Sequence, residues 1–341
     1  MSPSPVPPGL PLRLGDSGPA VRDLHQRLGS SGFSDTGDVE TFDDHTERAL
    51  RAFQSSRRLV EDGICARQTW SALVDADYRL GDRMIYLRSP MTRGDDVTDL
   101  QQRLGSLGFD AGWLDGIFGP DTERAVRDFQ HNQGLAAEGV VGRETVAAFG
   151  RLAGRQSGVK TVAEVRDRER LRERSGVHGQ RLIIGEAGGL PAVVHGLARR
   201  LRLDGAEVLT LHQPDLSDQA RAANAWDGHA YLGITLADYG QQVSYFEIDG
   251  FTSYGGKELA ERCAAALQPL FSSPQLSQSE PVKASGMRLP ILRETRMPAV
   301  WCRLGPAPLI VEHAAAVTDS LREAVAMWCT ESPNDASLST N

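Results

Sequence analysis

The stretch VRDLHQRLGSSGF at residues 21–33 returns 76 positions later as VTDLQQRLGSLGF at residues 97–109. The correspondence runs without a gap from residues 21–69 onto residues 97–145, and within it TERALRAFQ faces TERAVRDFQ. Self-similarity at a fixed offset indicates a duplicated unit of supersecondary structure. The first half of the chain is therefore predicted to contain two copies of one small fold.

The spacing of apolar residues predicts what that fold is. Two segments of the first copy carry apolar residues at helical intervals. These residues are Val21, Leu24 and Leu28 in the first segment and Ala49, Leu50 and Phe53 in the second. A short third helix is expected to begin near Thr69, and near Thr145 in the second copy. We predict two all-α, three-helix repeats at residues 12–78 and 88–153, with their phenylalanines in the cores.

A tight turn of the form D-G-x-F-G-x-x-T precedes the second helix of the second repeat. It consists of Asp115, Gly116, Phe118, Gly119 and Thr122, and its glycines permit the positive φ that such a turn requires. The string resembles the signature of peptidoglycan-binding-domain-1 modules. This resemblance makes Trp113, Asp115 and Phe118 the candidate glycan-binding residues, with the Trp113 ring stacking on a sugar.

The first repeat departs from this turn. It keeps Phe42 and Thr46 but has Val39, Glu40 and Asp43 where the second repeat has Asp115, Gly116 and Gly119. A glycan groove is therefore not expected in the first repeat.

A charged segment follows the repeats at residues 154–178. Its part VAEVRDRERLRER, residues 162–174, alternates positive and negative side chains at helical reach. We interpret it as a solvated linker helix, with partner binding as the alternative.

The remaining domain, residues 179–330, is predicted to be an open α/β fold. Strands are expected near residues 181–184, 207–211, 230–235, 242–248 and 299–304, and helices at residues 193–203, 256–270 and 318–327. The chain as a whole is thus predicted to be multidomain, with the all-α repeats preceding an open α/β domain.

Segments of this last domain resemble the zinc-dependent N-acetylmuramoyl-L-alanine amidases of the amidase-3 family. RLIIGEAGG at residues 181–189 is similar to the family's first strand and its I-D-P-G-H-G-G loop, which places Ala187 at the position of the first zinc histidine. The family's next loop, which carries a glutamate ligand, has no counterpart between Gly189 and the helix expected from Val193.

Two further segments carry the same resemblance. The helix RAANA at residues 221–225 and the strand AYLGIT at residues 230–235 place Thr235 at the second histidine ligand. MPAVWCRLG at residues 297–305 is similar to the P-A-V-L-V-E-x-G strand and places Arg303 at the catalytic glutamate. A zinc hydrolase needs its ligands and a base, so we expect neither a metal cofactor nor catalysis at these vestigial positions. Glu186 and Glu247 are the candidate acids for a rebuilt hydrolytic site.

Composition and the pattern of apolar segments exclude several classes of function and location. A formal net charge of -8 and a pI near 5.6 argue against a nucleic-acid partner. Residues 1–11 have no export-signal pattern, and no run reaches the roughly 20 apolar residues of a membrane-spanning helix. We therefore expect a cytoplasmic protein whose four cysteines are buried, reduced thiols.

The tail at residues 331–341 is polar and is predicted to be disordered. Hydroxyl side chains in and beside it are candidate phosphoacceptors, with an inert terminus as the alternative. They are Thr330, Ser332, Ser337, Ser339 and Thr340.

The order of these parts resembles the CwlM-type pseudo-amidases of actinobacteria. The resemblance implies a catalytically inactive, cytoplasmic regulator of peptidoglycan precursor synthesis. It further implies that the chain binds and stimulates a MurA-type UDP-N-acetylglucosamine enolpyruvyl transferase, under control of a serine/threonine protein kinase and with a muropeptide or lipid-linked precursor as a further ligand. The alternatives are a non-catalytic peptidoglycan- or muropeptide-binding protein and an active zinc amidase.

Overall fold

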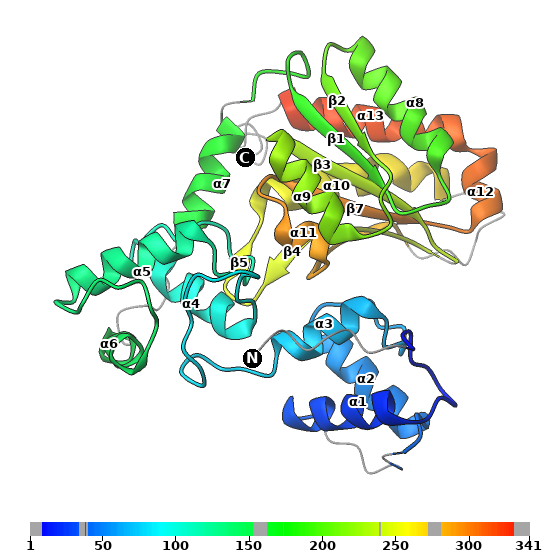
Figure 1. The fold of residues 1–341 in the computed structure, drawn as a ribbon. Coiled ribbons are helices and arrows are strands. Elements are labelled where there is room, and N and C mark those ends of the chain that lie inside the picture. The colour runs from blue at the N-terminus through cyan, green and yellow to red at the C-terminus, as the bar shows by residue number, and fades with distance from the viewer. Residues whose placement is uncertain are drawn as a thin grey trace, which may run out of the picture. The chain divides into compact units, whose positions relative to one another are not determined.

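The computed structural model describes residues 9–33, 38, 40–152, 162–172, 174–238, 240–271 and 281–330. Tertiary contacts divide the chain into two units, residues 1–163 and residues 164–341. Figure 1 shows helices alone in the first unit and a sheet with helices on it in the second. The predicted fold class is confirmed.

Each repeat of the first unit consists of three helices, as predicted. They are α1 (Pro19–Ser30), α2 (Asp44–Ser56) and α3 (Arg67–Asp75) in the first repeat, and α4 (Asp95–Ser106), α5 (Pro120–Asn132) and α6 (Arg143–Leu152) in the second. The residues that defined the helical spacing are buried, with Leu28 and Phe53 in the first core and Leu104 and Phe129 in the second. The Phe129 ring stacks on Phe149 with ring centroids 4.1 Å apart.

A buried glutamine explains why both repeats keep a glycine after their second helix. The Gln54 side chain donates from Nε2 to the Thr69 hydroxyl at 3.2 Å and accepts at Oε1 from the Gly63 N–H at 2.9 Å. Gln130 makes the same pair of contacts with Thr145 and Gly139. Gly63 has a φ of 71°, and a side chain there would meet Glu47 at 2.8 Å. Only glycine fits this turn without strain.

The second unit contains a seven-stranded sheet in the order β2-β1-β3-β7-β4-β5, with β6 also paired to β4. The strands are β1 (Arg181–Glu186), β2 (Glu207–Leu211), β3 (Ala230–Leu236), β4 (Gln241–Ile248), β5 (Phe251–Thr252), β6 (Lys283–Met287) and β7 (Ala299–Leu304). Strands β2, β1, β3 and β7 run parallel, whereas β4 is antiparallel to β7.

Successive side chains along each strand point to opposite sides of the sheet, which therefore has two faces of different composition. The first face carries apolar residues such as Ile184, Leu232 and Cys302, and it packs against α8 (Pro191–Leu203), α10 (Tyr254–Phe271) and α13 (Ala314–Thr330). Helices α9 (Leu216–Trp226) and α11 (Pro290–Glu294) contact each other, and α11 contacts β7 and β4. The short α12 (Ala307–Glu312) lies beside α13.

The expected strands and the three expected helices of this domain are present, but β5 and β6 were not predicted. The β6 sequence KASGM has small and polar residues in place of an apolar alternation. Its strand conformation comes from pairing with β4, from Gln242–Lys283 to Phe246–Met287, which is a non-local interaction.

Helix α7 (Val162–Arg172) forms where the charged segment predicted a helix, but it is not the solvated helix that we expected. The Asp167 residue is 1% exposed and Leu171 is 3% exposed. Asp167 Oδ2 accepts hydrogen bonds from the Gly255 N–H at 3.3 Å and the Ser253 hydroxyl at 3.5 Å. The carboxylate thus caps the amino end of α10, where free N–H groups favour negative charge.

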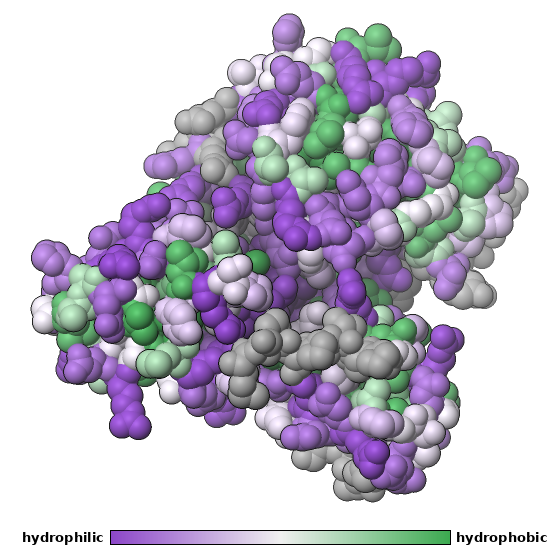
Figure 2. All heavy atoms as spheres, in the orientation of Figure 1, coloured by the Kyte–Doolittle hydropathy of each residue, from purple (hydrophilic) through white to green (hydrophobic). Residues whose placement is uncertain are grey.

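Hydrophilic residues predominate on the face in Figure 2, with apolar residues in small scattered groups. Within the described residues, no helix combines the length and the hydrophobicity that a membrane crossing demands.

Candidate functional site

The three positions at which the resemblance to the amidases leads one to expect zinc ligands and a base lie at the carboxyl edge of the parallel strands. Thr235 on β3 and Arg303 on β7 are register partners. Ala187 directly follows Glu186, whose partner on β3 is Ile234. Thr235 and Arg303 therefore lie side by side on the second face of β3 and β7, and Ala187 is the first residue beyond the adjoining end of β1. We call these three residues the row, and all three are partly exposed.

The chemistry of this row does not suit a zinc ion. Zinc sites use imidazole, thiolate or carboxylate ligands, whereas the row offers a methyl group, a hydroxyl and a guanidinium. Across the described ranges, no three His, Cys, Asp or Glu side chains are arranged to hold a metal ion. The permanently charged Arg303 would also repel a cation.

Aromatic side chains fill the second face behind the row. Trp301, two residues before Arg303 on the same strand, is 4% exposed, and a Cβ at Gly233 would collide with its indole ring. Gly185 leaves similar room for the Tyr231 hydroxyl, which donates to Gln219 Oε1 at 2.6 Å. Burial raises the pKa of Tyr231 well above its ordinary value, so the phenol stays a hydrogen-bond donor. The floor of the site is therefore tightly packed.

The two candidate acids lie apart from the row. Glu186 alternates to the first face, and its side chain is 10% exposed with Oε1 3.8 Å from His212 Nδ1. Its Oε2 is buried without a hydrogen-bond partner, and the His212 ring lies 5.3 Å from the His195 ring between centroids. Glu247 lies on β4 opposite Thr252. The described residues thus do not combine these acids with histidines into a metal site.

The four cysteines are free and buried, as expected from the sequence. Burial raises the pKa of Cys65 to about 12 and that of Cys329 to about 11. The neighbouring Cys302 thiol and burial together raise the pKa of Cys263 well above its ordinary value. Thiols in such surroundings are poor nucleophiles and poor metal ligands.

The turn of the second repeat shows what its candidate glycan-binding residues do. Asp115 Oδ1 accepts hydrogen bonds from the Ile117 N–H at 2.8 Å and from Gln101 Nε2 at 2.9 Å, which holds the turn. Phe118 is fully buried in the repeat core, so it cannot contact a glycan and instead anchors the turn from below. Trp113 is partly exposed and is the accessible aromatic residue of the three.

The first repeat builds the equivalent turn with other residues, and sequence reasoning missed this substitution. His25 occupies the position of Gln101, with Nε2 3.3 Å from the Thr41 carbonyl oxygen and 3.2 Å from the Thr46 hydroxyl. Asp43 caps α2 by accepting from the Thr46 N–H at 2.9 Å. The 76-residue offset, which places His25 opposite Gln101, was the available signal.

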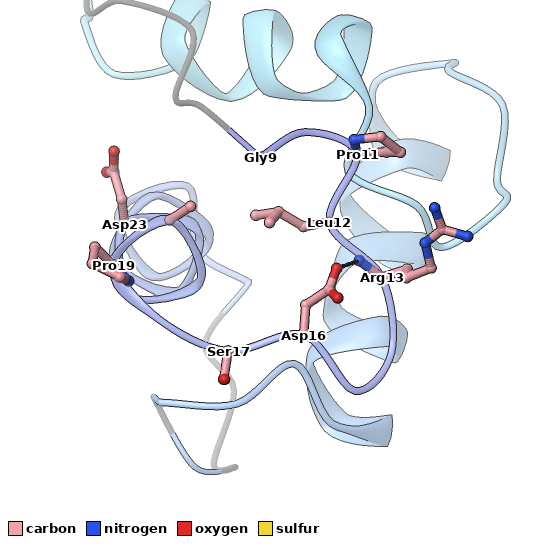
Figure 3. Close-up of a pocket in the computed structure, with 9 residues that line it drawn as sticks. Gly9, Pro11, Leu12, Arg13, Asp16, Ser17, Pro19 and Asp23 are labelled. Atoms are coloured by element: carbon pink, nitrogen blue, oxygen red, sulfur yellow. Dashed lines mark hydrogen bonds between the residues drawn. The ribbon is translucent and has the colours of Figure 1, made fainter.

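A cavity of about 550 Å³ lies beside the loop that precedes α1. Figure 3 shows Leu12 pointing toward α1, which contributes Pro19 and Asp23 to the wall. Its acidic groups are engaged, because Asp16 Oδ2 accepts from the Arg13 N–H at 2.8 Å and Asp23 pairs with Arg27 at 2.9 Å. No pattern in the sequence indicated this cavity, and its lining does not suggest catalytic chemistry.

The candidate phosphoacceptors are only partly within the structure. Thr330 is the exposed last residue of α13, and its hydroxyl donates to the Ala326 carbonyl oxygen. Ser332, Ser337, Ser339, Thr340 and the predicted disorder of residues 331–341 lie outside the described residues.

Comparison with known proteins fits both units. The family described as "Putative peptidoglycan binding domain" matches residues 17–73 and 93–149, one match for each repeat. N-acetylmuramoyl-L-alanine amidase CwlM of Mycobacterium tuberculosis is 31% identical over 370 aligned positions, which cover 92% of this chain and 86% of that protein. The chain belongs to the CwlM family.

Proteins that are similar to only part of this CwlM-family chain also carry amidase names. N-acetylmuramoyl-L-alanine amidase CwlL of Bacillus licheniformis is 32% identical over 161 residues, covering 41% of this chain and 45% of CwlL. Among solved structures, the amidase Ami1 of Mycobacterium smegmatis is 12% identical with a TM-score of 0.37, covering 46% of this chain and 99% of Ami1.

Proposed function

We propose that this chain is a catalytically inactive amidase homologue that regulates peptidoglycan precursor synthesis in the cytoplasm. It binds and stimulates a MurA-type UDP-N-acetylglucosamine enolpyruvyl transferase under serine/threonine kinase control. Membership of the CwlM family supports a role connected with peptidoglycan. The observation that supports the loss of catalysis is that Thr235 and Arg303 are register partners and that Ala187 follows Glu186, the register partner of Ile234, so three groups unsuited to zinc chemistry occur at this edge of the sheet.

The physical argument concerns the steps of zinc-dependent amide hydrolysis. The metal must be held by neutral imidazoles and a carboxylate, and a base must take a proton from the attacking water. Ala187 cannot coordinate, and the Thr235 hydroxyl is a weak neutral ligand. Arg303 cannot accept a proton, because a guanidinium stays protonated in proteins.

The test of inactivity measures zinc content and hydrolysis of muramyl peptides on the same purified chain. We expect no bound zinc after dialysis and no release of peptide. A zinc content of about one per chain together with hydrolysis would overturn the proposal and would show that the chain is an active zinc amidase.

The regulatory part is tested with the purified enolpyruvyl transferase. We expect direct binding and a higher turnover rate when the chain is present, with kinase treatment altering the effect. No binding and an unchanged rate, with and without kinase treatment, would eliminate the regulator.

A second function is favoured by the second repeat. Its Asp115 turn is intact, Trp113 is partly exposed, and the peptidoglycan-binding family matches residues 93–149. These features support non-catalytic binding of peptidoglycan or muropeptides. Co-sedimentation with purified peptidoglycan should then fall for Trp113→Ala and not for Trp70→Phe, since Trp70 is buried in the first core. Absence of sedimentation by the unaltered chain would remove this function.

A further inference from the structure

The start of the second repeat contains a socket that is filled by an arginine side chain. The Arg83 guanidinium donates two hydrogen bonds to the buried Asp96 carboxylate, and its Nη2 also donates to the Arg93 carbonyl oxygen at 2.8 Å. A Cβ on Gly94 would lie 2.9 Å from the same nitrogen. The guanidinium therefore rests directly on the backbone that leads into α4.

The first repeat has the same backbone arrangement at this place. The Gly18 N–H donates to the Glu40 carbonyl oxygen at 3.3 Å, and the Gly94 N–H donates to the Gly116 carbonyl oxygen at 3.1 Å. Both glycines have a positive φ, 115° and 155° respectively, and the 76-residue offset relates the two pairs. Ala20 therefore stands at the position that the buried carboxylate occupies in the second repeat.

The first repeat has no arginine of its own for this position. In the second repeat a bridge between Ile85 and Val141 follows two residues after the arginine. In the first repeat the same bridge joins Leu12 to Cys65. The residue two positions before that bridge is Leu10, whose side chain packs on the core of the repeat. An apolar residue thus replaces the cation, and it faces a different part of the fold.

The cavity beside the loop before α1 lies at this position. Its lining includes Ser17, Pro19 and Ala20, which flank Gly18 on both sides. A Cβ on Gly18 would meet no atom of a described residue within 4 Å, in contrast to the crowded glycine of the second repeat. The volume of about 550 Å³ is within the range of about 300–1,000 Å³ that ligand pockets have. We call this cavity the open socket.

The wall of the open socket suits the two parts of an arginine side chain. Leu12, Pro19 and Ala20 offer apolar surface on which the methylene stem can lie. Figure 3 shows the Asp16 carboxylate turned toward Leu12 and the Arg13 side chain directed away from it. Asp16 Oδ2 accepts from the Arg13 N–H at 2.8 Å, whereas Oδ1 makes no hydrogen bond with a residue that the structure describes. This oxygen can accept from a guanidinium.

We propose that the open socket binds an arginine side chain of a partner protein. The guanidinium donates to the Asp16 carboxylate and to the Ser17 carbonyl oxygen, the counterpart of the carbonyl that Arg83 contacts in the second repeat. The second repeat thus fills its socket from its own chain, and the first repeat fills its socket from outside. This inference goes beyond the proposed function and does not depend on it.

The experiment titrates the isotope-labelled full chain with N-acetyl-arginine methylamide and follows the Gly18 amide signal by nuclear magnetic resonance. We expect a saturable shift of this signal. The citrulline analogue has a neutral group on a side chain of the same length, so it should bind at least about tenfold more weakly. Ala20→Asp places a carboxylate where the second repeat has Asp96, and it should tighten binding of the arginine probe at least about tenfold.

Two further variants locate the probe, and a third is the control. Asp16→Asn keeps the contact with the Arg13 N–H but removes the charge, so binding should weaken several-fold. Ala20→Leu fills the socket and should abolish binding. Asp121→Asn is the matched control, because Asp121 lies on α5 of the second repeat with a side chain that is 49% exposed, and it should leave the affinity unchanged.

Three results would overturn the inference. They are absence of any shift at millimolar probe concentration, equal affinity for the citrulline analogue, and unchanged affinity in Ala20→Leu with a native circular dichroism spectrum. Binding that appears only after removal of residues 1–8 would assign the socket to the chain's own first residues. Self-association of the chain that Ala20→Leu abolishes would assign it to a second copy. Either outcome would contradict an arginine from a partner protein.

Discussion

The carboxylate of Asp96 accepts two hydrogen bonds from the Arg83 guanidinium, at 2.7 Å to Nε and 2.9 Å to Nη2, although the Asp96 side chain is fully buried. Asp96 lies in the first turn of α4, and Arg83 lies in the segment that connects the two repeats. Arg83 Nη2 also donates to the Arg93 carbonyl oxygen at 2.8 Å. This ion pair therefore fixes the start of the second repeat to the connection that leads into it.

Asp96→Asn should destabilise the first unit, because it leaves the Arg83 cation without its buried counter-charge. Breaking a buried pair costs about 3–5 kcal/mol, and because Arg83 is 23% exposed we expect the lower part of that range. Urea unfolding measures the change. Asp99→Asn is the matched control, because the Asp99–Arg103 pair is 40% and 33% exposed, and an exposed pair contributes about 0–1 kcal/mol. Equal losses of unfolding free energy in Asp96→Asn and Asp99→Asn would show that the buried Arg83–Asp96 pair stabilises the unit no more than an exposed pair does.

Gly233→Ala should destabilise the second unit, since the new methyl group would collide with the Trp301 indole. Overpacking of a core costs about 1–3 kcal/mol. In the background of Trp301→Leu the same substitution should cost less, and thermal unfolding of the four proteins gives the coupling energy. Strictly additive effects would show that the indole does not lie on Gly233.

The parts of this fold that the sequence could predict are those set by local spacing. Val21, Leu24 and Leu28 form one helical face whatever else the chain does, and the same holds for the second repeat. Helix α7 was predicted as a helix for the same local reason. The burial of Asp167 was not predictable, because it depends on the amino end of α10 more than 80 residues later in the sequence.

The positions of the candidate site could be predicted only in part from the sequence. Resemblance to the amidases pointed to Ala187, Thr235 and Arg303, and the sheet order then brought them into one row. Gln242 and Lys283 join that row only because β4 pairs antiparallel with β7 and parallel with β6. No spacing along the chain encodes that pairing, so this part of the row became visible only in the structure.

The stability of the first repeat should depend on pH through Asp43, which caps the start of helix α2. The Thr46 N–H and further hydrogen bonds hold the pKa of Asp43 below its ordinary value of 3.8. A lowered pKa means that the unfolded chain binds the proton more readily, so the contribution of the Asp43 charge is present above about pH 3.8 and is lost as pH falls through the folded pKa. Asp43→Asn keeps a capping side chain without the charge. The stability difference between the two proteins should therefore shrink below pH 3.8, and a constant difference down to pH 3 would show that the Asp43 charge does not stabilise the start of α2.

Restoring imidazoles to the row should restore zinc binding. In Ala187→His/Thr235→His the two new side chains would extend from neighbouring strand ends about 5 Å apart, a separation that two ligands of one tetrahedral zinc can bridge. The Arg303 cation would still oppose the metal, so we expect weak binding in this variant and tighter binding when Arg303→Glu is added, approaching about one zinc per chain.

The control variant is Ala187→Gln/Thr235→Gln/Arg303→Glu, whose new side chains have a similar length but no imidazole. It tests whether zinc binding depends on coordination by the histidines. Zinc content after dialysis, measured by plasma mass spectrometry, should be near zero for this control and for the unaltered chain. Hydrolysis of muramyl peptides is not expected even in the zinc-binding variant, because the glutamate loop of the amidases has no counterpart between Gly189 and α8, which begins at Pro191. A histidine variant that folds natively but binds no more zinc than the glutamine control would show that Ala187 and Thr235 do not face one common point at the sheet edge.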